Sequence, residues 1–255
     1  MNPKAWRGAV VPVGLIIAAQ AALQGTASDA LAPPTAALQA LWAAAVDGSL
    51  WQLTGQTLGA AAAGLLLGGG VGVLLGVWFG LSRRASQAGA PTVELLRPVP
   101  SVALIPVALL VFGFGWRLEI AVVAFACCFP MLLLTRSAVQ AVEPRLLEVA
   151  QVLGLGPWRR TWRIVLPAAV PRLFVALRLC AGIALVVAVT TEVAANPQGL
   201  GFAMVSAQQS LMPERMIGLL LWLALLGWGL NAGLLLLQRR WFGAHSPMTE
   251  AGSAA

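Results

Sequence analysis

The chain has 255 residues, of which 59% are apolar and only 10% are charged, and its formal net charge is +7. Counting the 27 glycines as apolar raises that share to about 70%, against roughly 45–50% in soluble domains. A globule of this composition has too few ionic groups to cover its surface, so a soluble enzyme is excluded. We predict an all-α integral membrane protein. Basic residues that flank membrane spans account for the net charge, so no nucleic-acid partner is expected.

Side chains that could carry catalysis are scarce. His245 is the only histidine, and Cys127, Cys128 and Cys180 lie inside apolar runs, so we expect buried thiols and no metal site. Lys4 is the only lysine, which leaves none for a P-loop that would hold nucleotide phosphates. No serine stands in a G-x-S-x-G motif either. We therefore expect that the chain is not an enzyme and binds no cofactor itself.

Six apolar stretches have about the length of a membrane-spanning helix, which is roughly 20 residues. They are 8–24, 55–81, 99–115, 118–135, 168–193 and 216–237. The first could instead be a secretory signal, but no clear A-x-A cleavage site follows it. The third is the weakest, because prolines interrupt it. The sequence thus predicts six transmembrane helices.

The basic residues orient these spans, since positive charge gathers on the cytoplasmic side. With a cytoplasmic N-terminus, the inner side carries Lys4, Arg7, Arg83, Arg84, Arg97, Arg136, Arg145, Arg159, Arg160, Arg163, Arg172, Arg239 and Arg240. The outer side carries only Arg117 and Arg215. Both termini are then cytoplasmic. The domain division is an N-terminal helix and outer loop at 1–50, a transmembrane domain at 51–240, and a cytoplasmic tail at 241–255 that we expect to be disordered.

Small residues recur along the second predicted span. Every fourth position is a glycine, namely Gly64, Gly68, Gly72, Gly76 and Gly80. Residues four apart lie on one face of a helix, and a smooth face of this kind lets two helix backbones approach closely in lipid. Packing within the chain is the favoured interpretation; a dimer interface and a pathway wall are the alternatives.

The longest inner connection, between the fourth and fifth spans, contains a predicted helix–turn–helix. Pro144 suits a first helical position, and the apolar residues that follow have helical spacing up to Gly154, which is placed to end the helix in a left-handed turn. A second short helix over 158–165 carries three arginines. The apolar stripe is too short to be buried alone, so either lipid headgroups or another protein must cover it.

In its residue spacing, the segment 143–167 of this connection resembles the EAA loop of ABC-importer permeases. Glu148 and Ala150 are followed by Gly154 and, after nine more residues, by 164–167. The departure is Val149, which stands where the family has its middle alanine. The matching positions are Glu148, Val149, Ala150, Gly154, Ile164, Leu166 and Pro167. The resemblance covers about 50–240 and is closest to the nitrate, sulfonate and taurine branch, which segments at 96–106 and 194–202 also resemble.

This resemblance implies a MetI-like helical bundle in a bacterial cytoplasmic membrane. It implies a homodimer that binds two copies of an ATPase subunit through the loop and receives substrate from an extracytoplasmic binding protein. ATP and magnesium are then expected on the ATPase, not on this chain. In that arrangement Glu148 pairs at the partner interface, Ala150 allows close approach and Gly154 sets the turn.

Polar residues within the fifth span are candidates for the translocation pathway, because an intramembrane charge costs about 2.5–3.5 kcal/mol on insertion scales. Arg178 either stabilises the inner interface or faces the pathway as a cation for an anionic substrate. The other candidates lie toward the outer mouth and are Thr190, Thr191, Glu192 and Asn196. Glu192 is about 21 Å from Arg178 along the helix, too far to pair with it.

The leading hypothesis is the permease subunit of an ABC importer for a small anion such as an aliphatic sulfonate, taurine or nitrate. A thiamine-precursor pyrimidine is the alternative substrate. A self-sufficient secondary transporter or channel is the alternative function, although the two halves show no convincing repeat. An intramembrane enzyme would need a nucleophile and base, or a metal cluster, within the spans.

Overall fold

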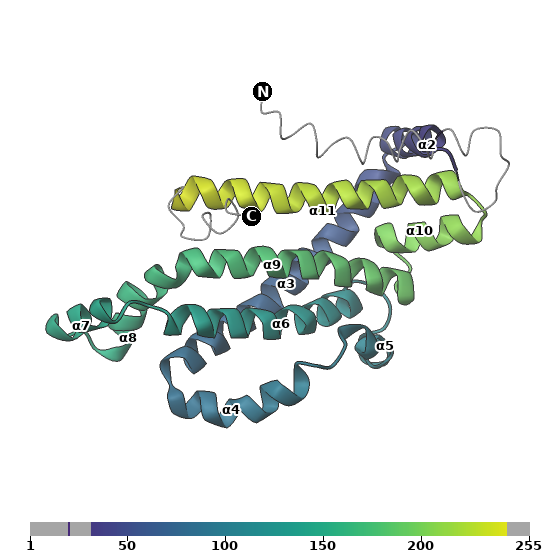
Figure 1. Cartoon of the computed structure of the whole chain (residues 1–255). Coiled ribbons are helices and arrows are strands. Elements are labelled where there is room, and N and C mark those ends of the chain that lie inside the picture. The colour runs from purple at the N-terminus through teal and green to yellow at the C-terminus, as the bar shows by residue number, and fades with distance from the viewer. Residues whose placement is uncertain (1–19, 21–31, 244–255) are drawn as a thin grey trace.

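A computed structural model of the chain describes residue 20 and residues 32–243, and those residues contain helices and no strand. In chain order the helices are α2 (Pro34–Val46), α3 (Ser49–Leu81), α4 (Arg83–Leu96), η1 (Ser101–Leu104), α5 (Ile105–Phe112), α6 (Trp116–Gln140), α7 (Pro144–Val152), α8 (Pro157–Arg160), η2 (Thr161–Val165), α9 (Leu166–Ala194), α10 (Gly199–Gln209) and α11 (Pro213–Phe242). The all-α prediction is confirmed for this part of the chain (Figure 1).

Four of the six predicted spans are present as long apolar helices. They are α3 with 33 residues, α6 with 25, α11 with 30, and a stretch of 38 residues from Pro157 to Ala194 that includes α9. At 1.5 Å per residue each is long enough to cross a bilayer. The second short helix predicted before the fifth span is not separate, because α8, the π-helical turn η2 and α9 run on without a break.

The predicted span at 99–115 is not confirmed as one span, since its helical part, η1 and α5, covers only Ser101–Phe112. Here α4 and the segment Ser101–Phe112 form a pair bent by 80°. Pro98 and Pro100 stand in the bend, and proline has no N–H to continue a helical hydrogen-bond ladder. The residues described therefore hold four spans, or five if the bent pair counts as one. The span predicted at 8–24 lies outside the described residues except for Gln20.

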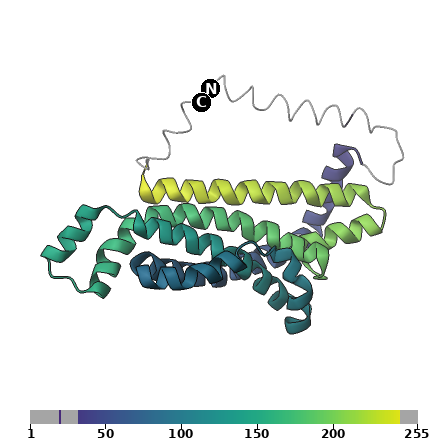
Figure 2. The same cartoon turned by 60° about the horizontal axis from the view of Figure 1, so that its bottom comes forward.

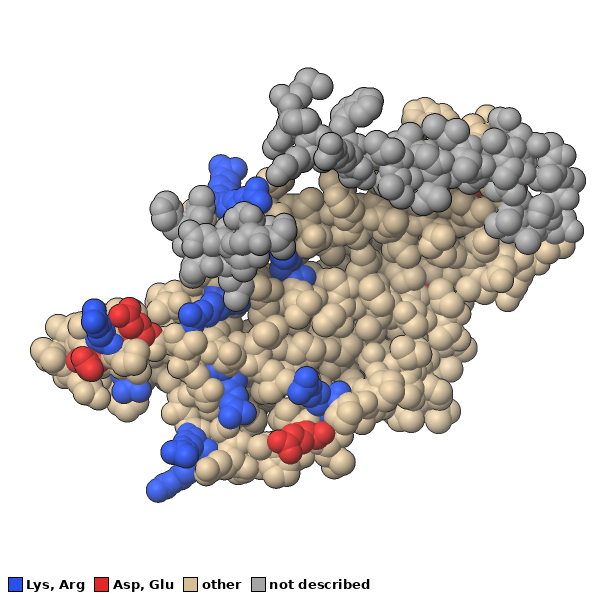
Figure 3. Space-filling view, viewed as in Figure 1, with Lys and Arg blue, Asp and Glu red and all other residues tan. Residues whose placement is uncertain are grey.

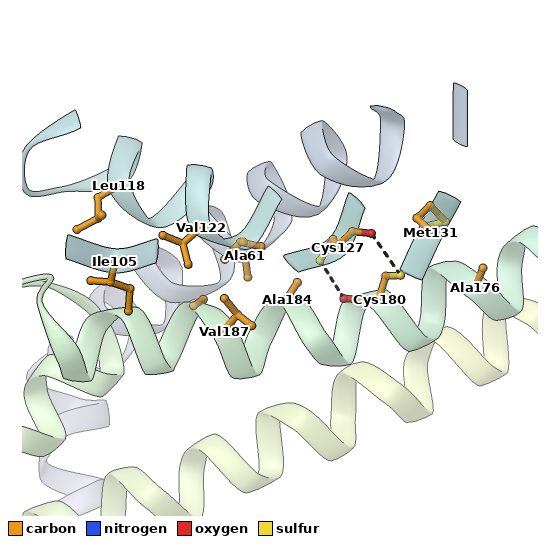
Figure 4. Close-up of a cluster of buried hydrophobic side chains, with 12 residues drawn as sticks. Ala61, Ile105, Leu118, Val122, Cys127, Met131, Ala176, Cys180, Ala184 and Val187 are labelled. Carbon is orange, nitrogen blue, oxygen red and sulfur yellow. Dashed lines mark hydrogen bonds between the residues drawn. The ribbon is translucent and has the colours of Figure 1, made fainter. Parts of the chain in front are cut away.

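The core lies where α3, α6 and α9 pack together (Figure 4). Leu118, Val122 and Val123 of α6 are fully buried there against small residues of α9. Cys127 and Cys180 face each other, and each thiol donates to the other residue's carbonyl oxygen, at 3.5 and 4.0 Å. Both are free and buried, as the apolar surroundings in the sequence predict, whereas Cys128, which was expected to be buried as well, is only half-buried.

The glycine face of α3 lies against α6 along most of its length. A Cβ added at Gly72 would come within 2.5 Å of the Cys128 carbonyl oxygen, and one at Gly76 within 2.6 Å of that of Leu132. At Gly68 it would collide with the backbone of Ala124. Gly64 and Gly80 likewise meet valines of α6. These contacts favour packing within the chain as the reason for the five glycines.

The bundle has two distinct ends. Helices α10 and α2 lie at one end, beside the start of α11, while α7 and α8 project beyond the other end (Figure 2). We call these the α10 end and the α7 end. At the α7 end, α11 runs two residues past the predicted domain limit of 240, and Phe242 and Trp241 pack on Phe174 with ring centroids 5.7 and 6.1 Å apart. The remainder of the predicted tail, 244–255, lies outside the described residues.

Three helices have no counterpart in the sequence interpretation. Helix α2 lies in the predicted outer loop, α4 follows the second span, and α10 follows the fifth. Each has 14 residues or fewer and thus falls below the length that signals a span. As the next section describes, α10 begins where side chains of α3 and α9 bind its first backbone amides.

Candidate coupling segment and translocation pathway

The segment that resembles the EAA loop is helix α7 and the turn after it. Pro144 occupies the first helical position, as expected. Gly154 has φ +63°, a left-handed conformation that an L side chain rarely adopts. Two backbone bonds close the turn: Gly154 N–H to the carbonyl of Gln151 at 2.9 Å, and Leu155 N–H to that of Ala150 at 3.0 Å. The predicted glycine-terminated helix is therefore present.

Helix α7 turns one small residue inward and its larger apolar residues outward. Ala150 is completely buried, whereas Val152 is 88% and Leu153 64% exposed. Val149 is half exposed, and Glu148 beside it is exposed as well. Nothing within the described chain covers these side chains. An apolar surface of this kind requires lipid or another protein.

Few contacts join the coupling segment to the spans. Leu147 of α7 packs against a small buried cluster formed by α6, Val165 and Ala169. Val165 belongs to the π-helical turn η2, which also contains Ile164, while Leu166 and Pro167 open α9. Arg172 of α9 donates from Nη1 to the carbonyl of Ala141 at 2.7 Å and so caps the end of α6. Motion of α7 would thus be transmitted first to α9 and α6.

Arg178 lies in a cavity between α6, α9 and α11. The cavity has a volume of about 490 Å³ and is lined mostly by leucine and valine side chains. Its other polar wall residue is Asn231 of α11, and Gly182 and Gly227 widen it. No salt bridge to Arg178 occurs among the residues that the structure describes. An intramembrane guanidinium without an acidic partner, in an apolar cavity, is suited to bind an anion.

Glu192 does not lie in that cavity but is buried at the α10 end, where it holds the start of α10. Its Oε1 accepts from the Thr57 hydroxyl of α3 at 2.7 Å, and its Oε2 accepts from Gly201 N–H at 2.8 Å. Thr57 Oγ1 in turn accepts from Leu200 N–H at 2.9 Å. Gly199 N–H donates to Gln56 Oε1 at 3.0 Å. All three N–H groups at the start of α10 are thus bound by side chains from α3 and α9.

A second buried carboxyl group belongs to the same cluster. Asn196, in the loop after α9, donates from Nδ2 to Glu119 Oε2 at 3.0 Å and accepts at Oδ1 from Gly115 N–H at 2.7 Å. Glu119, Glu192, Asn196 and Thr57 are each at most 1% exposed. We call these four residues, with the N-terminal turn of α10 (199–201), the clasp. It joins α3, α6, α9 and α10.

The predicted pathway residues are therefore split between two places. Arg178 lines the cavity, whereas Glu192 and Asn196 belong to the clasp about 20 Å along the helix. The hydroxyls of Thr190 and Thr191 bond to carbonyls one turn back, those of Val186 and Val187, at 2.7 and 2.8 Å. The sequence interpretation assigned no role in this cluster to Thr57 or Glu119. The sequence offered one indication of a buried role for Glu119, namely that it is an acidic residue within an apolar stretch.

Charge is distributed unevenly between the two ends. On the face drawn in Figure 3, arginine side chains gather at the α7 end and along α4, and none is seen over the α10 end. Arg159, Arg160 and Arg163 stand on α8 and η2. This asymmetry matches the predicted inner side of the membrane at the α7 end.

The family comparison decides the class of protein. Residues 68–241 match the family described as "Binding-protein-dependent transport system inner membrane component". The chain belongs to this family. It is thus a multi-pass transport permease of the bacterial inner membrane and is not expected to be an enzyme itself.

Three curated relatives of this permease are named for the transport of aliphatic sulfonates, taurine and nitrate. It is 31% identical over 180 residues to the putative aliphatic sulfonates transport permease protein SsuC of Bacillus subtilis, covering 71% of this chain and 65% of that one. It is 30% identical over 215 residues to the taurine transport system permease protein TauC of Escherichia coli, covering 82% and 78%. It is 30% identical over 186 residues to the nitrate import permease protein NrtB of Leptolyngbya laminosa, covering 73% and 66%.

Solved structures confirm the MetI-like fold of the permease. The inward-facing MetNI methionine ABC transporter matches 75% of this chain and 93% of its own, with a TM-score of 0.60 and 19% identity. An amino acid ABC transporter crystallised with histidines matches 78% of this chain and 97% of its own, with a TM-score of 0.60 and 18% identity. At these identities the likeness extends to the fold alone.

Proposed function

We propose that the permease is the membrane-spanning subunit of an ABC importer, that it forms the pathway for a small anion, and that a separate ATPase drives it through α7. The observation that carries the proposal is the uncovered apolar surface of α7 in a chain of this family. Because no P-loop lysine is available, ATP and magnesium bind to the partner.

The proposed assembly is a homodimer with two ATPase copies at the α7 ends and a substrate-binding protein at the α10 ends. The α7 end then faces the cytoplasm together with both termini. The excess of arginine at this end supports that orientation. Exposed Val149, Val152 and Leu153 would dock into the ATPase, with Glu148 pairing at the interface, and buried Ala150 would keep α7 close to the spans.

The proposed substrate is an aliphatic sulfonate, taurine or nitrate. Arg178 in the cavity between α6, α9 and α11 supports an anion, because a guanidinium binds planar or tetrahedral oxyanions with two parallel hydrogen bonds. The names of three relatives, for aliphatic sulfonates, taurine and nitrate, support the same choice. A neutral thiamine-precursor pyrimidine would make no use of this charge.

Transport by the reconstituted complex tests the function. The permease, purified with the ATPase that accompanies it, is placed in liposomes, and uptake of labelled taurine, an alkanesulfonate and nitrate is measured with the binding protein outside. We expect accumulation that needs ATP and the ATPase. Uphill uptake by the permease alone on an ion gradient would instead establish a secondary transporter.

The turn at Gly154 offers a sharper test of the coupling role. Gly154→Val places a β-branched residue at φ +63°, which costs about 2 kcal/mol and lowers the population of the intact turn roughly tenfold or more. We expect a comparable loss of ATPase co-purification and of uptake. Gly156→Val is the matched control, because Gly156 has φ −60° and equally open surroundings. Equal losses in both variants would contradict a specific role for the turn.

Substitution of Arg178 tests the anion pathway. Arg178→Gln removes a charge-assisted hydrogen bond worth about 1.5–3 kcal/mol, so the KM for uptake should rise roughly 10- to 100-fold. Arg178→Lys should recover part of this loss. Arg172→Gln is the control on the same helix, because Arg172 caps α6 and lines no part of the cavity. An unchanged KM in Arg178→Gln would remove this residue from the pathway.

A further inference from the structure

The clasp buries two carboxyl groups together without a cation. Glu119 and Glu192 are each 1% exposed, and neither forms a salt bridge within the described chain. Both belong to one buried cluster, in which Glu119 accepts from Asn196, and Glu192 accepts from Thr57 and Gly201. Two ionised carboxylates have no hydrogen to share and repel each other strongly in surroundings of low dielectric constant. The arrangement therefore needs a compensating positive charge.

The hydrogen bonds around Glu192 suit its ionised form. Both of its oxygens accept, one from Thr57 and the other from Gly201 N–H. The second donor belongs to the first turn of α10, where the exposed backbone amides of a helix favour negative charge. The backbone of Gly199 and Gly201 packs directly on this carboxyl group, and a Cβ at either position would collide with it. Each oxygen of Glu192 thus accepts one bond from the surrounding chain and keeps a second lone pair that could accept another.

The hydrogen bonds around Glu119 are incomplete in a way that suits its neutral form. Its Oε2 accepts from Asn196, but its buried Oε1 has no hydrogen-bond donor among the described residues. A carboxylic acid that carries its proton on Oε1 would turn this unsatisfied acceptor into a donor toward Glu192. We propose that the clasp is a proton-binding site, in which Glu119 holds one proton and donates it to the Glu192 carboxylate.

Loss of this proton would loosen the α10 end. It would leave two adjacent buried negative charges, one on α6 and one on α9, and the repulsion between them would act against the bonds that hold α10. The other groups that the surrounding elements contribute are uncharged: Gln56 and Thr57 from α3, Thr191 from α9 and Asn196 from the loop. Arg117 on α6 is exposed and makes no salt bridge within the described residues. Rising pH should therefore release the clasp.

Infrared spectroscopy of the purified full-length permease in lipid nanodiscs tests the proton directly. At neutral pH we expect a C=O stretch of a protonated carboxylic acid that disappears as the pH is raised. Glu119→Gln should abolish this band, while Glu94→Gln, which removes an exposed carboxyl group on α4, should retain it. Absence of the band from the unmodified permease overturns the proposal and needs no variant. A band that persists in Glu119→Gln overturns it equally.

Thermal unfolding gives a second, independent measurement. Because the folded permease would bind a proton that the unfolded chain releases, its stability should fall as pH rises. Between pH 6 and pH 9 we expect the unfolding midpoint to drop by at least about 5 °C. In Glu119→Gln the amide donates in place of the proton, so the drop should largely vanish. An equal drop in both proteins would contradict the proposal. These measurements use the permease alone, so they stand apart from the transport proposal.

Discussion

At the α10 end, three backbone amides of one short helix are bound by side chains from two other helices, whereas at the α7 end a helix of similar length packs Leu147 against a small apolar cluster and buries Ala150. The side chain of Leu200 is fully buried, while that of Val152 is 88% exposed. A salt bridge at the α7 end, between Arg145 and Glu143, is exposed and 3.9 Å long, so it contributes little. The short helix at the α10 end is thus held by side chains of the chain itself, whereas the one at the α7 end exposes apolar side chains that lipid or another protein must cover.

Helix α9 connects these two ends and passes the Arg178 cavity between them. Its 29 residues continue from η2, whose π-helical turn joins it to the coupling segment. Turns of this type occur frequently at functional sites. Displacement of α7 would therefore reach the cavity before it reached the clasp. If α7 is displaced, we expect the start of α10 to move less, because side chains of α3 and α9 bind its first three backbone amides.

The largest effect is expected where volume is added to the packed core that both ends share. Gly68→Val would place side-chain atoms on the backbone of Ala124 and force α3 away from α6. We expect a loss of at least about 3 kcal/mol, seen as little folded protein on size-exclusion chromatography. Gly70→Val is the control, since a Cβ there meets nothing within 4 Å. A folded Gly68→Val protein with an unchanged midpoint would contradict the described contact.

A matched pair of threonines compares the two ends directly. Thr57→Val in the clasp removes a donor from Glu192 and an acceptor from Leu200 N–H, so we expect a loss of about 2–4 kcal/mol. Thr161→Val at the α7 end removes only a bond to the carbonyl of Pro157 within one helical turn. Its effect should stay within about 0.5 kcal/mol. Thermal unfolding of both variants measures the difference, and equal losses would mean that the two ends are held alike.

Local sequence pattern was sufficient for the long helices and for the coupling segment. The length of the apolar stretches predicted α3, α6, α9 and α11, and Pro144 and Gly154 predicted where α7 begins and ends. Both kinds of prediction succeed because each depends only on residues that are close together in the sequence. The span at 99–115 was not confirmed, because only Ser101–Phe112 is helical and the chain bends by 80° between α4 and this segment, where Pro98 and Pro100 stand.

The clasp could not be predicted in the same way. Apart from the bond between Glu192 and Gly201, which are 9 positions apart, its bonds join residues 77 to 143 positions apart, such as Thr57 with Leu200, and no local periodicity records such a pairing. Glu192 and Asn196 were recognised as unusual polar residues in an apolar span, but their partners were not. The sequence did not predict helix α10 either, because tertiary contacts fix its start and no capping side chain of its own does so.

The smallest effect is expected at Asp47, on the surface of the α10 end. The hydroxyl and the backbone N–H of Ser49, the latter 2.8 Å from Oδ1, hold the pKa of this carboxyl group below its usual value of 3.8. A lowered pKa means that the charged group adds stability at neutral pH, and that this contribution is lost as the pH falls below 3.8. Asp47→Asn should therefore lower the unfolding midpoint slightly at pH 7 and not at all under strongly acidic conditions. Because Asp47 is exposed, salt should also weaken its attraction to Arg215. A midpoint loss of the same size at both pH values would show that the side chain acts through its shape and not through its charge.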